Sequence, residues 1–318
     1  MVAIISGKLV KFGASQNAKG GTELLAERLL KGTKKELLKN TNIIFNRPEL
    51  YKQYFASGIN ILNFQDLPDD RMYTNFFKSE MINKFSHFVF NSDYQKEEFC
   101  NKFDFKGRNI TVIKNSIIPI EIKQKKYDGK INLIYHTTPH RGLEILAHCF
   151  PKILAENDNV YLKIFSSLKI YGWDDKDKVF EPLYRKLKDM KNVEYSSNVS
   201  NEEIRAELIN THIFAYPNVW PESSCLAAIE AMSAKNLLVL PNLAALKETG
   251  SKSKFLYNFT NNASEQVNTF QKQLTLAIQF VQKQSEDYKS HLDELKIYAD
   301  NNHNLNEYLK KWERVLSK

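Results

Sequence analysis

Cysteine is scarce in this chain and does not occur in a pattern typical of a structural role. Three cysteines stand far apart, without the CxxC spacing of a zinc site: Cys100, Cys149 and Cys225. An odd number of widely spaced thiols excludes a scaffold held together by disulfides. We therefore expect a reducing compartment, and the cytoplasm fits best.

Glycine and proline are also few, at 11 and 9 among 318 residues, which excludes a collagenous or linker-rich chain. No run reaches the roughly 18 apolar residues that a membrane-spanning helix needs. The first residues, 1–7, lack the basic segment of a secretory signal. Any contact with an anionic membrane surface is therefore expected to be peripheral.

The residues that are present have globular proportions. Hydrophobic residues make up 42% of the chain, and 20 Phe and 15 Tyr supply enough area for sizeable cores. The length is roughly that of two domains. The net charge of +8 favours anionic partners such as nucleotides, phosphates, acidic lipids or nucleic acid.

Short β-branched runs alternate with helical patterns, which is typical of parallel sheets joined by crossover helices. Expected strands of the first half are 2–5, 42–45, 59–64, 87–90 and 110–113. Expected strands of the second half are 131–135, 160–165, 193–195, 213–216, 237–240 and 255–257. The sequence therefore predicts an α/β fold with two doubly wound, Rossmann-like halves.

A proline, a basic cluster and a glycine interrupt the alternation over 117–130, where we place the linker. We expect an N-terminal domain over 1–122, a C-terminal domain over 123–295 and a last helix over 296–318. That helix has an apolar stripe that needs a partner surface. Its members are Tyr298, Leu305, Tyr308, Leu309 and Trp312. The basic run 123–126 is expected to be a solvated linker.

The most specific segment is 216–232, in which Glu222 and Glu230 are separated by seven residues. A strand ends at Tyr216, and a Pro-rich turn leads to a helix with a serine as its expected N-cap. The amides at such a helix start form a site for a diphosphate. The residues concerned are Ser223, Ser224, Cys225 and Leu226. A helical rise of 1.5 Å per residue separates the carboxylates by up to about 12 Å. This distance is comparable with the span from the sugar to the ribose of a nucleotide sugar. Two surface glutamates beside an ordinary amphipathic helix are the alternative.

The segment resembles the E-x7-E signature of the retaining glycosyltransferases of family 4, and further pieces match that family in the same order. Gly20 and Gly21 resemble its early glycine loop, and 91–94 with 112–116 resembles the end of its first domain. The resemblance implies a GT-B fold, in which two Rossmann-like domains face a cleft and the last helix crosses back to the first domain. It also implies that Glu222 contacts the donor sugar and Glu230 the ribose hydroxyls.

Residues 136–142 follow the first strand of the second half, so they are expected at the carboxyl edge of its sheet. The family carries two cations here that neutralise the pyrophosphate. Arg141 occupies one of these positions and its planar fork suits phosphate, whereas His136 or a threonine replaces the other. Without the family, Arg141 is equally a surface residue at a helix start.

Two further candidates come from the first half. Gly20 and Gly21 would let the backbone approach an acceptor or a leaving phosphate closely, with Lys19 as a neighbouring cation. A plain turn is the alternative. Asp66 would orient the acceptor hydroxyl, or would form an Asx turn before Pro68.

Glu248 resembles a late glutamate of the family, although Ala244 or Ala245 replaces the preceding glycine. Residues 174–177 have the Asp-x-Asp form of metal-dependent glycosyltransferases, but no strand directly precedes them, and a solvated turn is the better interpretation. Cys225 is predicted to be a small buried residue. We therefore expect no metal and no cofactor other than the nucleotide-sugar substrate.

Together these features predict a metal-independent retaining glycosyltransferase that moves a sugar from a UDP- or GDP-linked donor to a glycan, lipid-linked or small-molecule hydroxyl. Catalytic roles are assigned to Glu222, Asp66 and Arg141. Two other classes stay open: a catalytically silent scaffold that binds nucleotide sugar or glycan, and a sugar-nucleotide epimerase on the same fold. Nucleic-acid binding has no recognition motif in its favour.

Overall fold

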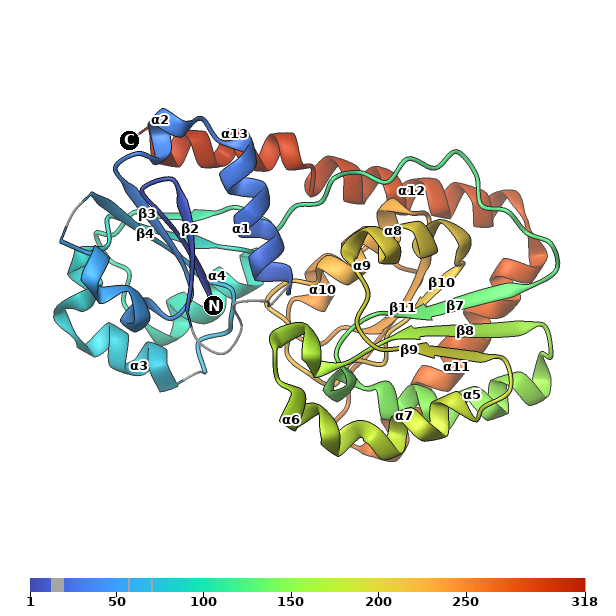
Figure 1. Ribbon diagram of the computed structural model, residues 1–318. Coiled ribbons are helices and arrows are strands. Elements are labelled where there is room, and N and C mark those ends of the chain that lie inside the picture. Colours follow the sequence, from blue (N-terminus) through green and yellow to red (C-terminus); the bar gives the residue numbers. More distant parts are fainter. Residues whose placement is uncertain (13–19, 57, 70, 318) are drawn as a thin grey trace. The chain divides into compact units, whose positions relative to one another are not determined.

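The computed structural model describes residues 1–12, 20–56, 58–69 and 71–317 (Figure 1). The chain divides into two compact units. Unit 1 comprises Met1–Ser116, Glu222–Ser224 and His303–Lys318, and unit 2 comprises Ile117–Pro221 and Cys225–Asn302. These bounds differ from those expected, because 117–122 and 296–302 belong to unit 2 and Glu222–Ser224 belongs to unit 1.

Unit 1 is built on a six-stranded sheet in the order β2-β1-β3-β4-β5-β6. Its strands are β1 (Val2–Ile5), β2 (Lys8–Lys11), β3 (Thr41–Phe45), β4 (Ile59–Asn63), β5 (His87–Phe90) and β6 (Ile110–Val112). From β3 to β6 the neighbours are parallel, as the sequence predicts. β1 runs antiparallel to both β2 and β3, which corrects the expectation of an entirely parallel sheet.

A tight hairpin that we do not predict from the sequence explains the antiparallel strand. Ser6 and Gly7 have positive φ values of 46° and 77°, and they join Ile5 to its pairing partner Lys8. Two-residue hairpin turns of this kind need left-handed backbone at both central positions, which glycine adopts readily. The crossover helix α1 (Gly21–Gly32) therefore follows β2, and β1 lies between β2 and β3.

Aromatic side chains dominate the core of unit 1. The ring of Phe64 lies at its centre, with neighbouring ring centroids 4.2 to 6.4 Å away. These neighbours are Tyr73, Phe77, Phe88, Phe90, Phe99 and Phe105. The helical segments after α1 are α2 (Lys35–Leu38), η1 (Pro48–Tyr54), α3 (Arg71–Lys78), η2 (Glu80–Lys84), α4 (Asp93–Lys102) and α13 (Leu305–Leu316).

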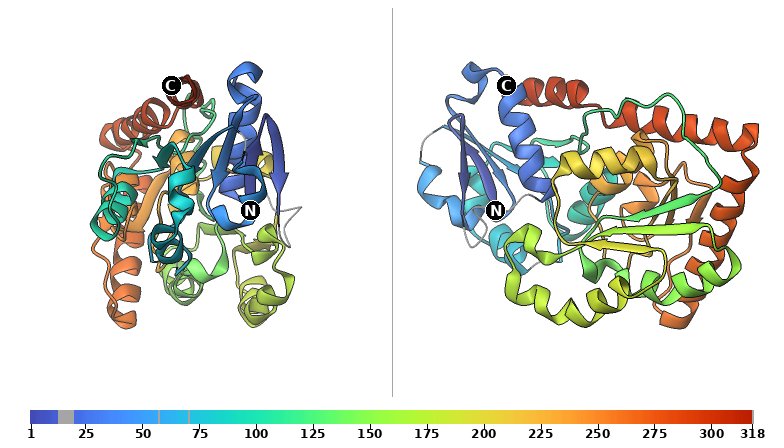
Figure 2. Two further views of the ribbon diagram at one scale, coloured as in Figure 1. Left: turned by 90° about the vertical axis from the view of Figure 1, so that its left-hand side faces the viewer. Right: turned by 45° about the vertical axis from the view of Figure 1, so that its right-hand side comes forward.

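The last helix, α13, lies beside α1 and α2 in unit 1 (Figure 2), so the chain returns to its first half as the resemblance implies. Tyr308 and Trp312 are buried, at 4% and 0% exposure, and Leu309 lies against Gly32 of α1. The predicted stripe is nevertheless divided. Tyr298 belongs to α12 (Glu286–Asn302) in unit 2.

Unit 2 contains a six-stranded sheet in the order β12-β11-β10-β7-β8-β9, in which every neighbouring pair is parallel. Its strands are β7 (Ile131–Tyr135), β8 (Val160–Phe165), β9 (Val193–Ser196), β10 (Ile213–Ala215), β11 (Leu237–Pro241) and β12 (Phe255–Tyr257). The chain builds outward from β7 to β9, then returns to β10 beside β7 and continues to β12. The reversal between β7 and β10 is the switch point of a doubly wound sheet.

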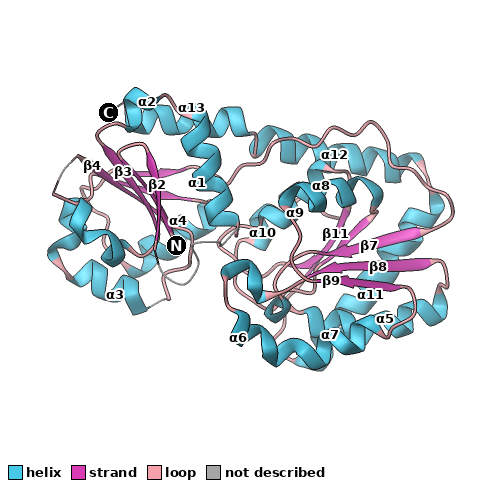
Figure 3. Cartoon of the chain, in the orientation of Figure 1, coloured by secondary structure: helices cyan, strands magenta, loops and turns pink. Residues whose placement is uncertain are grey.

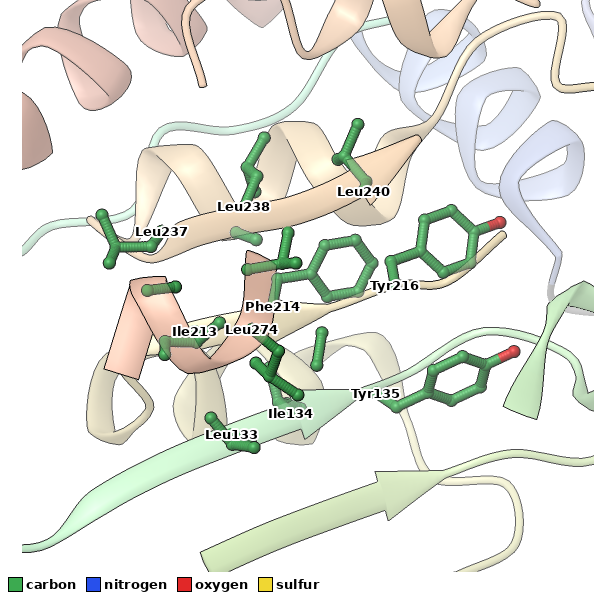
Figure 4. Close-up of a cluster of buried hydrophobic side chains, with 14 of the residues drawn as sticks. Leu133, Ile134, Tyr135, Ile213, Phe214, Tyr216, Leu237, Leu238, Leu240 and Leu274 are labelled. Atoms are coloured by element: carbon green, nitrogen blue, oxygen red, sulfur yellow. The ribbon is translucent and has the colours of Figure 1, made fainter. Parts of the chain in front are cut away.

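Helices cover both faces of this sheet, α5, α7 and α11 on one and α8, α9 and α12 on the other (Figure 3). The helical segments are η3 (Pro139–Arg141), α5 (Leu143–Glu156), η4 (Leu168–Tyr171), α6 (Asp174–Asp177), η5 (Lys178–Phe180), α7 (Glu181–Lys188), α8 (Asn201–Asn210), α9 (Leu226–Ser233), α10 (Leu246–Thr249), α11 (Ala263–Lys283) and α12. Burial on both faces requires continuous apolar strands. Figure 4 shows the resulting core, where the rings of Tyr135 and Tyr216 lie side by side, with centroids 6.0 Å apart.

The segment 117–130 belongs to unit 2, and one lysine of its basic run is buried, whereas Lys123, Gln124 and Lys126 are exposed as expected. Lys125 is buried, at 8% exposure, and its Nζ donates to the carbonyls of Leu208 at 2.6 Å and Ile209 at 3.2 Å. These carbonyls lie at the C-terminal end of α8, where no intrahelical donor remains for them. Burial lowers the pKa of Lys125, and the nearby Lys235 lowers it further. The expectation of a solvated linker over 123–126 is therefore wrong for Lys125.

Candidate functional site

The loops that follow β7 and β10 are neighbours at the carboxyl edge of the sheet in unit 2, because these two strands pair in parallel at the switch point. Ligands of doubly wound sheets bind at this edge. The first loop comprises 136–142, and the second comprises 216–225 and leads into α9. These are two of the loops from which the sequence predicts the donor site.

Gly142 allows the two loops to meet. Its φ is 96°, and a Cβ at this position would overlap the carbonyl oxygen of Pro217. Both conditions favour glycine. The second loop is fixed from within, because the buried amide of Asn218 donates to the Trp220 carbonyl and accepts from the Trp220 amide at 3.1 Å.

Replacement of Gly142 by alanine should therefore destabilise unit 2 by about 2 kcal/mol or more, since left-handed backbone and a backbone overlap act together. This corresponds to a fall in Tm of roughly 5 °C for a unit of this size, measurable by circular dichroism. Gly129→Ala is the matched control: its φ is 89°, but open space surrounds the added Cβ. We expect a smaller loss there, and equal losses would contradict a role for the contact with Pro217.

Three successive side chains of the first loop carry buried polar atoms that have no hydrogen-bond partner among the described residues. The atoms are His136 Nε2, Thr137 Oγ1 and Thr138 Oγ1. A buried polar atom left without a partner costs about 1 to 3 kcal/mol, and native structures retain few of them. A ligand with hydroxyls or phosphate oxygens would supply partners, so this cluster points to a polar ligand at the switch point.

Arg141 is the one residue of the first loop that is cationic at neutral pH. Burial lowers the pKa of His136 to about 3, so this histidine does not supply the second cation that the resemblance implies. Burial also lowers the pKa of His140 to about 4, and the charge of Arg141 contributes to that shift. Arg141 itself ends η3 and is half-buried. Any charge neutralisation by this loop therefore comes from Arg141.

Glu230 lies on α9 and is only 3% exposed. Its Oε1 forms an ion pair with Nη1 of Arg205 at 3.3 Å, and its Oε2 accepts a hydrogen bond from Nδ2 of Asn201 at 3.0 Å. Both partners belong to α8. These two contacts from α8 fix the direction of the carboxylate. Neither Arg205 nor Asn201 is predicted from the sequence, because their proximity to Glu230 arises only when α8 packs on α9.

The start of α9 differs from the expectation. Cys225 is the N-cap and Leu226 the first helical residue, so neither Ser223 nor Ser224 caps this helix. Cys225 is 4% exposed, and its thiol is a weak hydrogen-bond acceptor that competes little for the first amides. Anion binding at these first amides stays a prediction. Because 222–225 is not helical, the two glutamates do not lie on one continuous helix.

Glu222, Ser223 and Ser224 belong to unit 1, whereas Glu230 belongs to unit 2. Glu222 is 6% and Ser223 9% exposed. The hydroxyl of Ser223 donates to the Gln65 carbonyl at 2.6 Å and accepts from Nδ2 of Asn91 at 3.0 Å. This hydroxyl is therefore engaged within the protein, a role that sequence reasoning does not find.

Asp66 follows β4, and the amide of Asn46 holds its carboxylate. Nδ2 of Asn46 donates to Oδ2 of Asp66 at 2.8 Å, and Nη2 of Arg47 lies 4.0 Å from the same oxygen. Asn46 Oδ1 in turn accepts from the Gln65 amide at 2.6 Å and the Tyr73 hydroxyl at 2.7 Å. The side chain of Asp66 is 49% exposed, so its direction is fixed while its carboxylate stays accessible.

The other predicted residues lie at the start of α1 and on α10. Gly20 is the buried N-cap of α1 and Gly21 its first residue, while Lys19 lies outside the described residues. Glu248 is half-buried on α10, and its carbonyl accepts from the Tyr298 hydroxyl at 3.2 Å. Ala244, with φ of 51°, takes the left-handed position that would favour a glycine.

Asp177 is not part of a solvated turn, which corrects the expectation for 174–177. It is 5% exposed, and its carboxylate accepts from the Ser167 hydroxyl, the Leu168 amide and the Tyr184 hydroxyl, each at 2.7 Å. Asp177 therefore braces the segment after β8. In the described part of the chain, no group of three or more His, Cys, Asp or Glu side chains could hold a metal ion. No helix of the same residues has the length and apolar character to cross a membrane.

Comparison with known proteins gives matches to solved structures. No protein-family model matches the sequence, and no curated protein is significantly similar. A glycosyltransferase from Rickettsia africae superposes with a TM-score of 0.69 at 15% identity, over 96% of this chain and 83% of that one. Pneumococcal O-GlcNAc transferase GtfA, solved with UDP and GlcNAc, gives 0.64 at 12% identity, over 86% and 56%.

The fold is GT-B. A UDP-forming trehalose-phosphate synthase from Burkholderia vietnamiensis also superposes, with a TM-score of 0.65 at 11% identity, over 86% of this chain and 71% of that one. The chain spans only 56% of the length of GtfA. At these identities the likeness extends to the architecture of the two Rossmann-like units and no further.

Proposed function

We propose that the chain is a retaining glycosyltransferase whose donor is a nucleoside-diphosphate sugar. The observation that carries the proposal is the cluster of buried polar atoms without partners on His136, Thr137 and Thr138, beside Arg141. A diphosphate offers several acceptor oxygens, and the guanidinium fork together with the first amides of α9 would bind them. The GT-B architecture, shared with nucleotide-sugar enzymes, supports this ligand class.

In this proposal the two glutamates bind different parts of the donor. Glu230, directed by Arg205 and Asn201, accepts hydrogen bonds from the ribose hydroxyls. Glu222 accepts hydrogen bonds from hydroxyls of the transferred sugar. Asp66 orients the acceptor hydroxyl, because its carboxylate is fixed by Asn46 and remains accessible. Gly20, Gly21 and Glu248 are further residues of the proposed substrate site.

The reaction exchanges one bond at the anomeric carbon for another. The bond from C1 to the diphosphate oxygen breaks, the acceptor oxygen bonds to C1 on the same face, and the acceptor proton passes to the departing diphosphate. Arg141 and the amides of α9 stabilise the negative charge that develops on the diphosphate. No protein nucleophile and no further cofactor is needed.

A donor screen tests the proposal. The purified chain is incubated with UDP-glucose, UDP-GlcNAc and GDP-mannose separately, and release of the nucleoside diphosphate is measured with and without simple sugars, glycans and lipid-linked sugars as acceptors. We expect release from one donor class, faster with an acceptor that carries a hydroxyl. Binding of donor without release under any acceptor would instead favour the silent scaffold, and absence of binding would contradict the proposal.

Activity should not depend on a divalent metal, because Arg141 and helix amides supply the charge that a metal would otherwise provide. We expect EDTA to change the rate of nucleotide release less than twofold, as measured before and after chelation at constant ionic strength. Loss of the activity in EDTA with recovery in Mn²⁺ or Mg²⁺ would contradict this assignment.

A further inference from the structure

Ser223 is held by groups from two strand ends of unit 1 that are remote in sequence. Its hydroxyl donates to the carbonyl of Gln65, which follows β4, at 2.6 Å and accepts from Nδ2 of Asn91, which follows β5, at 3.0 Å. Ser92 donates its hydroxyl to the Ser223 carbonyl at 2.6 Å. Asn91 lies 132 residues from Ser223, and both side chains are buried.

The hydrogen bonds around Ser223 continue to α4 and to the loop that contains Asp66. The backbone amide of Asn91 donates to Oε1 of Gln95 at 2.8 Å, and Nε2 of Gln95 donates to the Asp66 carbonyl at 2.8 Å. Ser92 caps α4 by accepting from the Gln95 amide at 2.9 Å. Gln95 is fully buried. Buried networks with matched donors and acceptors hold a single geometry, since any broken bond leaves a buried group unsatisfied.

One atom of this network lacks a partner. Asn91 is 1% exposed, and its Oδ1 has no hydrogen-bond partner among the described residues. Its Nδ2 is committed to Ser223, so the amide cannot turn to satisfy Oδ1 without losing that bond. A buried carbonyl oxygen of this kind needs a hydrogen-bond donor. No described residue donates to it, and the hydroxyl of a ligand could.

We propose that Asn91 serves the transferred sugar: its Nδ2 holds Ser223, and with it the adjacent Glu222, while its Oδ1 accepts a hydroxyl of that sugar. The proposal rests on the proposed function and adds a sugar-binding residue from unit 1. Glu230 and its partners on α8 belong to unit 2. Because this proposal gives Asn91 a contact with the sugar, its loss should affect the sugar part of the donor and leave the affinity for the free nucleotide unchanged.

The test compares free nucleotide with nucleotide sugar in the full-length protein. For Asn91→Ala we expect Kd for UDP or GDP, whichever the wild type binds, to change less than twofold in calorimetric titration. The kcat/KM for release from the matching nucleotide sugar should fall at least tenfold. Ser223→Ala removes the hydrogen bonds with Asn91 and with the Gln65 carbonyl but keeps Oδ1 of Asn91, so it should lower kcat/KM less. Ser223→Thr, which keeps a hydroxyl, should stay closer to wild type than Ser223→Ala. The double variant should resemble Asn91→Ala, since the two residues act through one contact.

Asp93→Ala is the matched control, because Asp93 follows Ser92 directly but its side chain is 68% exposed and pairs with Lys114 at 3.2 Å. It should behave as the wild type. Equal weakening of UDP and nucleotide sugar by Asn91→Ala, or no effect on either, would overturn the proposal while leaving nucleotide-sugar binding by the wild type intact. If Asn91→Ala fails to fold, the Ser223 variants decide in the same way. A wild type that binds no nucleotide sugar would remove the proposed function and this inference together.

Discussion

Glu230→Ala should weaken nucleotide binding by roughly 100-fold, or about 3 kcal/mol, while the protein stays folded. The carboxylate is buried and directed by two side chains of α8, Arg205 and Asn201, and hydrogen bonds to charged groups each contribute about 1.5 to 3 kcal/mol. Removal of the carboxylate also deletes the ion pair with Arg205 and leaves an uncompensated positive charge beside the proposed position of the ribose. Calorimetric titration with UDP and GDP measures the effect.

Glu202→Ala is the control for Glu230, since Glu202 lies exposed on the first turn of α8 and should leave both affinities unchanged. Glu230→Gln should fall between the control and Glu230→Ala, because an amide keeps one acceptor oxygen but not the ion pair with Arg205. Unchanged affinity of Glu230→Ala for every nucleotide that binds to the wild type would contradict the assignment of the ribose site.

Deletion of residues 303–318 should unfold unit 1 more than unit 2, although unit 2 is the adjacent part of the sequence. Removal of a buried tryptophan alone costs about 3 to 5 kcal/mol, which is a large part of the 5 to 15 kcal/mol by which a typical domain is stable. Trp312 is fully buried and Tyr308 nearly so. The deletion also removes His303, whose Nδ1 lies 2.8 Å from the Asn115 carbonyl.

Hydrogen exchange measures this outcome. We expect protection to fall over residues 20–116 and to persist over 131–302. Trp312→Ala should give the same pattern in milder form, and Lys311→Ala, an exposed position on the same helix, should give none. A loss of protection confined to 131–302 would show that α13 does not stabilise unit 1.

Much of the fold follows from the sequence because parallel strands buried on both faces must be apolar throughout. The runs at 87–90 and 131–135 therefore mark β5 and β7 with the bounds that the structure has. β2 is not recognised in this way, because it lies at a sheet edge and only two apolar residues stand between Lys8 and Lys11. The hairpin is signalled only by Ser6 and Gly7, a short turn that is easily taken for a strand end.

The candidate site is predictable where one segment carries several of its groups. The spacing of Glu222 and Glu230 and the loop 136–142 are visible in the sequence, although the roles of these residues stay predictions. The contacts of Ser223 with Asn91 and of Glu230 with Arg205 are not visible, because nothing in a local pattern specifies which distant side chain will meet another. Lys125 is a second example of a distant contact that a local pattern does not predict. A lysine in a basic run is usually solvated, and only the position of α8 explains its burial.

The division of the chain into units has a consequence for protein engineering. The polypeptide passes from one unit to the other after Ser116, Pro221, Ser224 and Asn302. The two units therefore cannot be exchanged by a fusion at a single position. A chimera that joined residues 117–302 to the first half of another protein with this fold would contain Ser223 but not Asn91, Ser92 or Gln65, which form its hydrogen bonds. Functional recombinants should therefore need 65, 91–95 and 222–224 from one parent, and these positions should change together as such proteins diverge.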